Sequence, residues 1–330
     1  MKDLSSLLSR RLILTLTSAV LLGLMPRSAI AQSYPERPIR LIVPFAAGGG
    51  SDSVGRVIAD RLSHELGQPV IVENRPGAGG SIGAAQVAKA APDGYTLLLG
   101  STSELAQYPH VSGKVPYDPQ TDFAPISLVG TVSLVLTVSS KLPIKDVEEL
   151  IAYARKNPGK LNYGSAGTGS STHLAMALFA HLAKVEMLNI SYKGSAPVVT
   201  DLLAGNIDLA MPTMSAVLPH IKSDRLRVIG VSTAEPSVIL PDVEVIGSVL
   251  SRYEAGLWTG LLAPAGTPNE IIDKLHGAVA KALSEPKVQT MLISQGAEAT
   301  GSSPAVFAAQ IKRENAVWSE VVKQTGIRIK

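Results

Sequence analysis

The stretch Pro44-Phe45-Ala46-Ala47-Gly48-Gly49-Gly50-Ser51-Asp52 joins an apolar run at 39–43 to an amphipathic segment at 51–66. The run predicts a buried strand and the segment predicts a helix. A chain that passes through glycines into a helix leaves the first N–H groups of that helix without intrahelical acceptors, at the positive end of the helix dipole. The junction therefore suits an anion such as a phosphate or a carboxylate.

A second junction of this kind follows later in the chain, Asn162-Tyr163-Gly164-Ser165-Ala166-Gly167-Thr168-Gly169-Ser170-Ser171-Thr172-His173. A third strand–turn–helix corner lies at Tyr192-Lys193-Gly194-Ser195-Ala196-Pro197, and the hydroxyls of Ser101-Thr102-Ser103 follow a predicted strand at 95–99. Ligands of open α/β sheets lie beyond the carboxyl ends of the strands. The two glycine-rich junctions therefore predict a ligand held from both sides.

Several of these side chains allow two interpretations. Asp52 either complements the helix dipole or binds a donor group of the ligand. His173 either packs or caps its helix, or it contacts the ligand. Lys193 either neutralises an acid or is an exposed turn residue. The hydroxyls at 101–103 either cap a helix or contact the ligand.

The order of predicted elements indicates an α/β protein with two lobes. Strands and helices alternate over 39–99 with short connections, which predicts parallel pairing and right-handed crossovers. The pattern repeats from a long β-rich stretch at 126–139, and the tail after Leu226 has too few strands for a third domain. We expect a signal peptide at 1–31, a first domain at 32–133, a second at 134–226, and a return to the first at 227–330, with two crossings between the lobes.

The first 31 residues have the features of a secretory signal. Lys2, Arg10 and Arg11 precede an apolar run at 12–24, which is shorter than the roughly 20 residues that span a membrane. The small-residue pattern that ends at Ala31 predicts cleavage there, and the export route is either Sec or twin-arginine. The mature protein is therefore expected to be exported.

The composition excludes several classes of function. Four of the 30 Lys and Arg residues and one of the 27 Asp and Glu residues lie in 1–31, so the remainder has 26 of each and is formally neutral. This balance gives no basic field for nucleic acid. The absence of cysteine excludes disulfides and thiolate chemistry. The scattered histidines have no metal-ligand spacing, so neither a metal nor a cofactor is expected.

Catalytic and nucleotide-binding motifs are weak. The glycine clusters lack the third glycine of a dinucleotide fingerprint, and no P-loop is present. Gly79-Gly80-Ser81-Ile82-Gly83 fits the nucleophile-elbow pattern, but the elbow should follow a strand directly, whereas 74–80 intervenes. Helix N-capping by Ser81 is the better interpretation, and a secreted serine hydrolase using Ser81 is the alternative from another class.

The chain resembles the Bug family, the periplasmic receptors of tripartite tricarboxylate transporters. The resemblance rests on an ordered set of segments from Tyr34 almost to the C-terminus. They are Tyr34-Pro35-Glu36-Arg37-Pro38-Ile39, Val43-Pro44-Phe45, Glu73-Asn74-Arg75-Pro76-Gly77-Ala78-Gly79-Gly80, Pro92-Asp93-Gly94-Tyr95-Thr96-Leu97-Leu98, Tyr117-Asp118-Pro119, Asp122-Phe123-Ala124-Pro125, 164–174, Tyr192-Lys193-Gly194, Asp201-Leu202-Leu203-Ala204-Gly205, Pro219-His220-Ile221-Lys222 and Ala263-Pro264-Ala265-Gly266-Thr267-Pro268.

The resemblance implies a two-lobe periplasmic-binding-protein (Venus flytrap) fold that captures a small carboxylate through main-chain amides, hydroxyls and helix dipoles. It also implies delivery to the transmembrane subunits of the transporter by a non-enzymatic receptor, which we expect to be a monomer. A ligand sensor for a signalling partner would use the same fold. The chain departs from many relatives in lacking a glutamate within 175–179. The expected ligand-binding residues are Phe45, Ala47, Gly48, Gly49, Gly50, Ser51, Asp52, Ser101, Thr102, Ser103, Ser165, Gly167, Thr168, Gly169, Ser170, His173, Tyr192, Lys193 and Gly194.

Overall fold

The computed structural model describes residues 34–223 and 225–328. The expected signal peptide and its cleavage site lie outside these residues. The chain divides into two units, Met1–Glu36 and Arg37–Lys330, and the second contains the whole fold. Within the described residues, no helix combines the length and apolarity needed to cross a bilayer.

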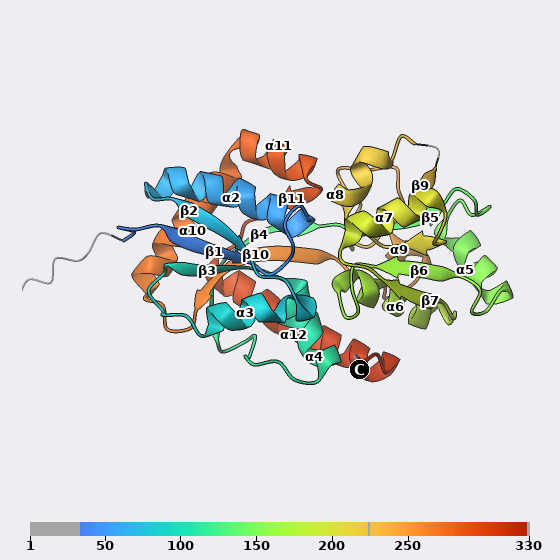
Figure 1. Cartoon of the computed structure of the whole chain (residues 1–330), viewed down its shortest axis with the longest axis horizontal. Coiled ribbons are helices and arrows are strands. Elements are labelled where there is room, and N and C mark those ends of the chain that lie inside the picture. The colour runs from blue at the N-terminus through green and yellow to red at the C-terminus, as the bar shows by residue number, and fades with distance from the viewer. Residues whose placement is uncertain (1–33, 224, 329–330) are drawn as a thin grey trace, which may run out of the picture. The chain divides into compact units, whose positions relative to one another are not determined.

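Two mixed sheets organise the second unit, as the predicted α/β class requires (Figure 1). The first sheet has the strand order β11-β4-β10-β3-β1-β2 and the second has the order β7-β6-β8-β5-β9. The first sheet contains β1 (Ile39–Val43), β2 (Val70–Asn74), β3 (Thr96–Ser101), β4 (Phe123–Val132), β10 (Leu257–Pro264) and β11 (Ala297–Ala299). The second contains β5 (Val135–Ser139), β6 (Asn162–Ser165), β7 (Leu188–Ser191), β8 (Leu209–Ala210) and β9 (Leu226–Val231).

We call the first sheet with its helices lobe 1 and the second sheet with its helices lobe 2. The helices α2 and α11 lie on one face of the first sheet, and α3 and α12 lie on the other (Figure 1). Lobe 1 has α2 (Gly50–Leu66), α3 (Ser81–Ala88), α4 (Tyr108–Ser112), α10 (Asn269–Ser284), α11 (Pro286–Ser294) and α12 (Pro304–Thr325). Lobe 2 has α5 (Val147–Lys156), α6 (Ser171–Ala183), α7 (Ser195–Ala204), α8 (Met214–Val217) and α9 (Ile246–Val249).

The expected parallel pairing near the start of the chain is present. Strand β1 pairs in parallel with both β2 and β3, which places the carboxyl ends of these strands at one edge of the sheet. Strand β6 pairs in parallel with β7 and β8, so their carboxyl ends also share an edge. Each of the two glycine-rich junctions therefore begins at the carboxyl end of a strand, after β1 and after β6.

The chain crosses between the sheets twice, as predicted, after β4 and after β9. The long β-rich stretch predicted at 126–139 consists of most of β4 followed by β5, and the predicted boundary at 133/134 lies between these two strands, which belong to different sheets. Strand β9 lies beyond the expected boundary at 226, yet it pairs with β5 in the second sheet. Helix α9 also packs in lobe 2, so the second crossing lies between α9 and β10.

Local signals fix the helix ends. Helix α2 ends at Gly67, whose φ of 68° lies in the left-handed region that glycine adopts at low cost. Asp146 caps α5 by accepting a hydrogen bond from the Glu149 N–H at 2.8 Å. Ser303 caps α12 in the same way, and Pro304 occupies its first turn.

Helix α12 contributes to the cores of both lobes. Its first half buries Phe307 and Ile311 in a cluster with residues of the first sheet. Its second half buries Trp318 and Val322 in a cluster formed mainly by lobe 2. The helix therefore joins the two cores, in addition to the two strand crossings.

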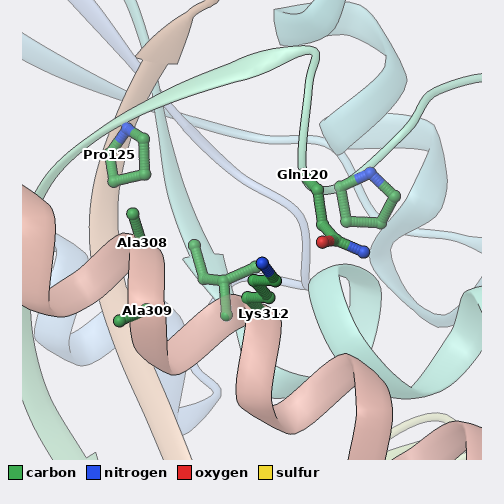
Figure 2. A pocket seen from close by; sticks show the side chains of 7 residues that line it. Gln120, Pro125, Ala308, Ala309 and Lys312 are labelled. Atoms are coloured by element: carbon green, nitrogen blue, oxygen red, sulfur yellow. The ribbon is translucent and has the colours of Figure 1, made fainter.

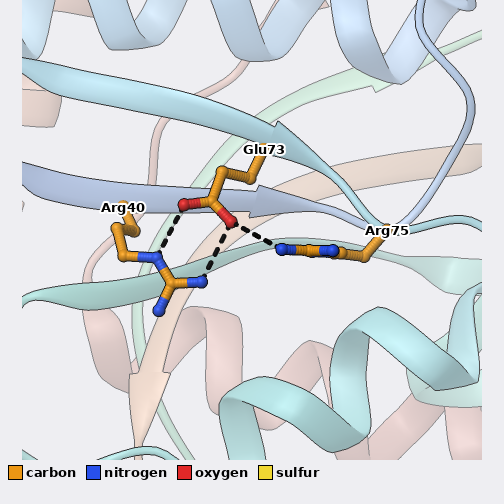
Figure 3. A network of polar contacts seen from close by, with 3 residues as sticks. All are labelled: Arg40, Glu73 and Arg75. Carbon is orange, nitrogen blue, oxygen red and sulfur yellow. Dashed lines mark hydrogen bonds and ion pairs between the residues drawn. The ribbon is translucent and has the colours of Figure 1, made fainter.

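An ion-pair network lies on β1 and β2 (Figure 3). Arg40 donates two hydrogen bonds to the Glu73 carboxylate, at 2.7 and 2.9 Å, and Arg75 donates a third at 3.1 Å. The bonds from Arg40, above all, lower the pKa of Glu73 to about 2. A lowered carboxyl pKa means that the network stabilises the folded state above pH 4.5 and loses this effect as the pH falls towards 2.

We expect Glu73→Gln to lower the free energy of unfolding by about 1 kcal/mol at pH 7, because solvent screens this partly exposed network. The difference from wild type should disappear near pH 2. Urea unfolding at several pH values measures it. Glu186→Gln, at an exposed site, is the matched control. If Glu73→Gln lowers the free energy of unfolding equally at pH 7 and near pH 2, the stabilisation by Glu73 does not come from its ion pairs.

Candidate ligand-binding site

The junction between β1 and α2 presents an uncapped helix start. Residues 46–49 are exposed, and Gly48 has a φ of 80°. Gly49 occupies the N-cap position, and no side chain accepts a hydrogen bond from the first turn of α2. The amides of this turn therefore remain available to an anion at the positive end of a 17-residue helix.

Asp52 holds the loop of this junction in place through hydrogen bonds. Its buried carboxylate accepts hydrogen bonds from Gly48 N (2.9 Å), Arg56 Nε (3.0 Å) and Asn74 Nδ2 (2.9 Å). Burial raises the pKa of this carboxyl, but the bonds from the three donors outweigh it, so the pKa is lowered. Asn74 Nδ2 also donates to the Phe45 carbonyl at 3.0 Å, so both ends of the loop are fixed. The carboxylate thus points into its own loop.

The junction between β6 and α6 satisfies much of its own polar backbone. Ala166 N donates to Thr172 Oγ1 at 2.7 Å, and Ser170 Oγ donates to the Gly167 carbonyl at 2.7 Å. Gly167 and Gly169 have φ values of 139° and 77°, which glycine adopts without strain. The buried Ser165 Oγ, at the end of β6, has no hydrogen-bond partner among the described residues. It is a candidate donor to a ligand.

His173 acts as a cap of this loop. Its Nδ1 accepts a hydrogen bond from Gly169 N at 3.0 Å, and its ring stacks on Tyr163 with centroids 6.3 Å apart. Burial lowers the pKa of His173, which favours the neutral ring. Because Nδ1 accepts, the proton of the neutral ring is on Nε2. His173 therefore packs and caps within the protein, as one of its two interpretations predicts. Its Nε2–H can in addition donate a hydrogen bond to a ligand.

The corner after β7 lies against the same loop. Gly194 N donates to the Ala166 carbonyl at 3.2 Å, and Lys193 is exposed. The Tyr192 hydroxyl donates to Asp201 at 2.6 Å, and burial together with this bond raises the pKa of Tyr192 to about 12. The Tyr192 hydroxyl is thus bound to a protein carboxylate.

The hydroxyls of Ser101, Thr102 and Ser103 are all buried and all bonded to protein groups. Ser101 Oγ donates to Glu104 Oε2 at 2.6 Å. Thr102 Oγ1 accepts from Trp258 N at 3.0 Å, and Ser103 Oγ donates to the Gly79 carbonyl at 2.8 Å. All three hydroxyls are therefore bonded within the protein, and Thr102 at the N-cap position of the following turn makes no side-chain cap hydrogen bond.

Sequence reasoning missed two hydroxyls that lie at the site. A Cβ atom placed on Gly50 would be 3.1 Å from Ser215 Oγ and 3.9 Å from Thr213 Oγ1. These side chains follow β8 and begin α8, so they bring lobe 2 against the start of α2. A second link between the lobes joins Ser171 Oγ to the buried Gln107 Oε1. The rule that identified the other junctions, polar residues after a predicted strand, would also have found 213–215.

Features of other classes of site are weak in the described part of the chain. Ser81 begins α3 and is separated from β2 by residues 75–80, so it lacks the setting of a nucleophile elbow. No group of three or more His, Cys, Asp or Glu side chains there could hold a metal ion. A hollow of about 250 Å³ lies beside α12, between Gln120, Pro125 and Lys312 (Figure 2). Among the described residues, none of the predicted ligand-binding residues lines it.

Comparison with known proteins places these features in a family. Residues 54–327 match the tripartite tricarboxylate transporter family receptor, TctC. Protein BugT of Bordetella pertussis is 38% identical over 302 residues, which are 91% of this chain and 93% of BugT. The solved structure of R. palustris Rpa4515 with adipate is 37% identical, with a TM-score of 0.84 over 89% of this chain and 99% of that one. MatC from Rhodopseudomonas palustris with bound malate is 32% identical, with a TM-score of 0.80 over 88% and 100%.

The family match covers most of the chain, and the two solved structures share its fold over 88–89% of its length. The resemblance seen in the ordered sequence segments is confirmed, and so is the two-lobe fold. The chain belongs to the TctC family of tripartite tricarboxylate transporter receptors, which includes the Bug proteins.

Proposed function

We propose that this receptor binds a small carboxylate between the uncapped start of α2 and the β6–α6 loop and delivers it to the membrane subunits of a tripartite transporter. The observation that carries the proposal is the first turn of α2, whose amides have no side-chain cap. It meets hydroxyls of lobe 2 at Thr213 and Ser215. The related receptors with adipate and with malate support a carboxylate as the ligand class.

Neutral donors would hold the ligand. The first-turn amides of α2 offer one set, and Ser165 Oγ and the Nε2–H of His173 offer another. Lys193 is the one cationic side chain among the predicted ligand-binding residues, and it is exposed. Backbone amides and helix dipoles stabilise a carboxylate without a buried cation. The proposal also describes the protein as a monomeric, periplasmic receptor that is not an enzyme.

A thermal-shift screen of mono-, di- and tricarboxylates tests the proposed function. At a concentration one hundred times its dissociation constant, the correct acid should stabilise the protein by about 2.7 kcal/mol. The matching neutral amides are the control, because they have similar size but no charge for the dipole. No shift with any acid, in a protein that native mass spectrometry shows to be free of ligand, would contradict carboxylate binding.

A further inference from the structure

The start of α8 in lobe 2 lies against two glycines of lobe 1. A Cβ atom placed on Gly50 would be 3.1 Å from Ser215 Oγ, which is tighter than most real contacts. A Cβ atom placed on Gly296, in the turn between α11 and β11, would be 2.5 Å from Ser215 N and 3.0 Å from Met214 Cβ. At this contact between the lobes, lobe 1 therefore presents two glycines, which have no side chain.

The two glycines differ in what their backbone requires. Gly296 has a φ of 71°, a conformation that by itself favours glycine. Gly50 does not have a positive φ, and it begins α2. Alanine would therefore fit its backbone and favour the helix. The close atoms that a Cβ on Gly50 would meet belong to Thr213 and Ser215 of lobe 2. A side chain at position 50 would thus be opposed by lobe 2 and not by its own lobe.

We propose that Gly50 is a positioning residue for lobe closure: its missing side chain lets Ser215 approach the start of α2, and this approach sets ligand affinity. The ligand part rests on the proposed function, whereas the contact between the lobes does not. The Ser215 hydroxyl also forms a hydrogen bond with Thr213 Oγ1 at 3.2 Å, so a methyl group at position 50 would displace either this bonded hydroxyl or the whole start of α8, and we expect the lobes to move apart.

The test combines Gly50→Ala with Gly50→Ala/Ser215→Ala, which removes the opposing hydroxyl. For a carboxylate identified by the screen, Gly50→Ala should weaken binding by about tenfold or more in wild type, and it should weaken binding much less when the double variant is compared with Ser215→Ala alone. The control is Gly277→Ala, an exposed helical glycine with open space around its Cβ position. It should keep the affinity of wild type.

A distance between spin labels tests the contact without any ligand. The chain has no cysteine, so Glu270→Cys in lobe 1 and Lys222→Cys in lobe 2 can be labelled at these exposed positions alone. Gly50→Ala should lengthen the distance in the unliganded protein, and Ser215→Ala in the same chain should reverse the change.

Two results would overturn the inference. One is a label distance that Gly50→Ala leaves unchanged. The other is a loss of affinity on Gly50→Ala that is as large in a Ser215→Ala background as in wild type, since this would mean that the methyl group acts without the Ser215 hydroxyl. Failure of all carboxylates to bind would contradict the proposed function, while the label distance would still decide the role of Gly50.

Discussion

Replacement of Asp52 by alanine is expected to lower the free energy of unfolding by about 2–3 kcal/mol and to remove carboxylate binding. The carboxylate accepts from Gly48 N and Asn74 Nδ2, and Asn74 in turn binds the Phe45 carbonyl. Without the carboxylate, the loop before α2 loses its internal support, and the amides of the first turn lose their fixed position. Isothermal titration with an acid from the screen and urea unfolding measure the two effects.

Arg56→Ala separates the carboxylate from its ion pair. Arg56 is exposed and its guanidinium is one of three donors to Asp52, so its removal should change stability little and leave binding intact. Asp52→Asn keeps the shape of the side chain but exchanges one acceptor for a donor. Its stability and affinity should lie between those of Asp52→Ala and Arg56→Ala. If Asp52→Ala folds and binds with the affinity of wild type, the loop before α2 does not depend on Asp52 for its position.

Most of the fold could be predicted from the sequence, because its strongest elements have local signals. The apolar run at 39–43, the amphipathic segment at 51–66 and the strand at 95–99 became β1, α2 and β3, with observed bounds within two residues of the predicted ones. The π-helical turn Ser103–Gln107 and strand β11 were missed. The three residues of β11 pair with β4, and the turn packs against α12, so tertiary contacts and not local pattern define both.

The candidate site could be predicted as a set of segments but not as a set of contacts. The sequence placed glycines and hydroxyls after the strands, and the structure shows which of them are already bonded within the protein. Thr102 is an example: its Oγ1 accepts from the Trp258 amide of β10, far along the chain. No spacing rule could reveal such a partner, because the pairing of β3 with β10 is a property of the sheet order.

Glu104 shows the same limit for a charged residue. Its side chain is fully buried beside the end of β3, and Ser101 donates to it through both its amide and its hydroxyl. The Tyr117 hydroxyl donates to the Glu104 carbonyl at 2.7 Å. Glu104 lies in the turn that ends at Gln107, which binds Ser171 of lobe 2. The carboxyl group thus supports a segment that joins the lobes.

Glu104→Gln is expected to make the protein more stable at pH 8 and above, by roughly 3–5 kcal/mol. Burial raises the pKa of Glu104 to about 8 despite the hydrogen bonds from Ser101. Between pH 4.5 and 8 the folded protein keeps this proton and the unfolded chain loses it, so stability falls as the pH rises through this window. Glutamine has the shape of the protonated acid and can accept from the Ser101 amide while it donates to the Ser101 hydroxyl.

Urea unfolding of wild type and Glu104→Gln at pH 4.5, 6, 7 and 8.5 measures this effect. The two proteins should have similar stability at pH 4.5 and diverge as the pH rises, with the glutamine variant the more stable. Glu186→Gln, at an exposed site in lobe 2, should follow wild type at every pH. Parallel curves for Glu104→Gln and wild type would show that Glu104 ionises in the folded protein as it does in the unfolded chain. The buried carboxyl would then hold the 101–107 segment as an anion, and the pH dependence of stability would have another source.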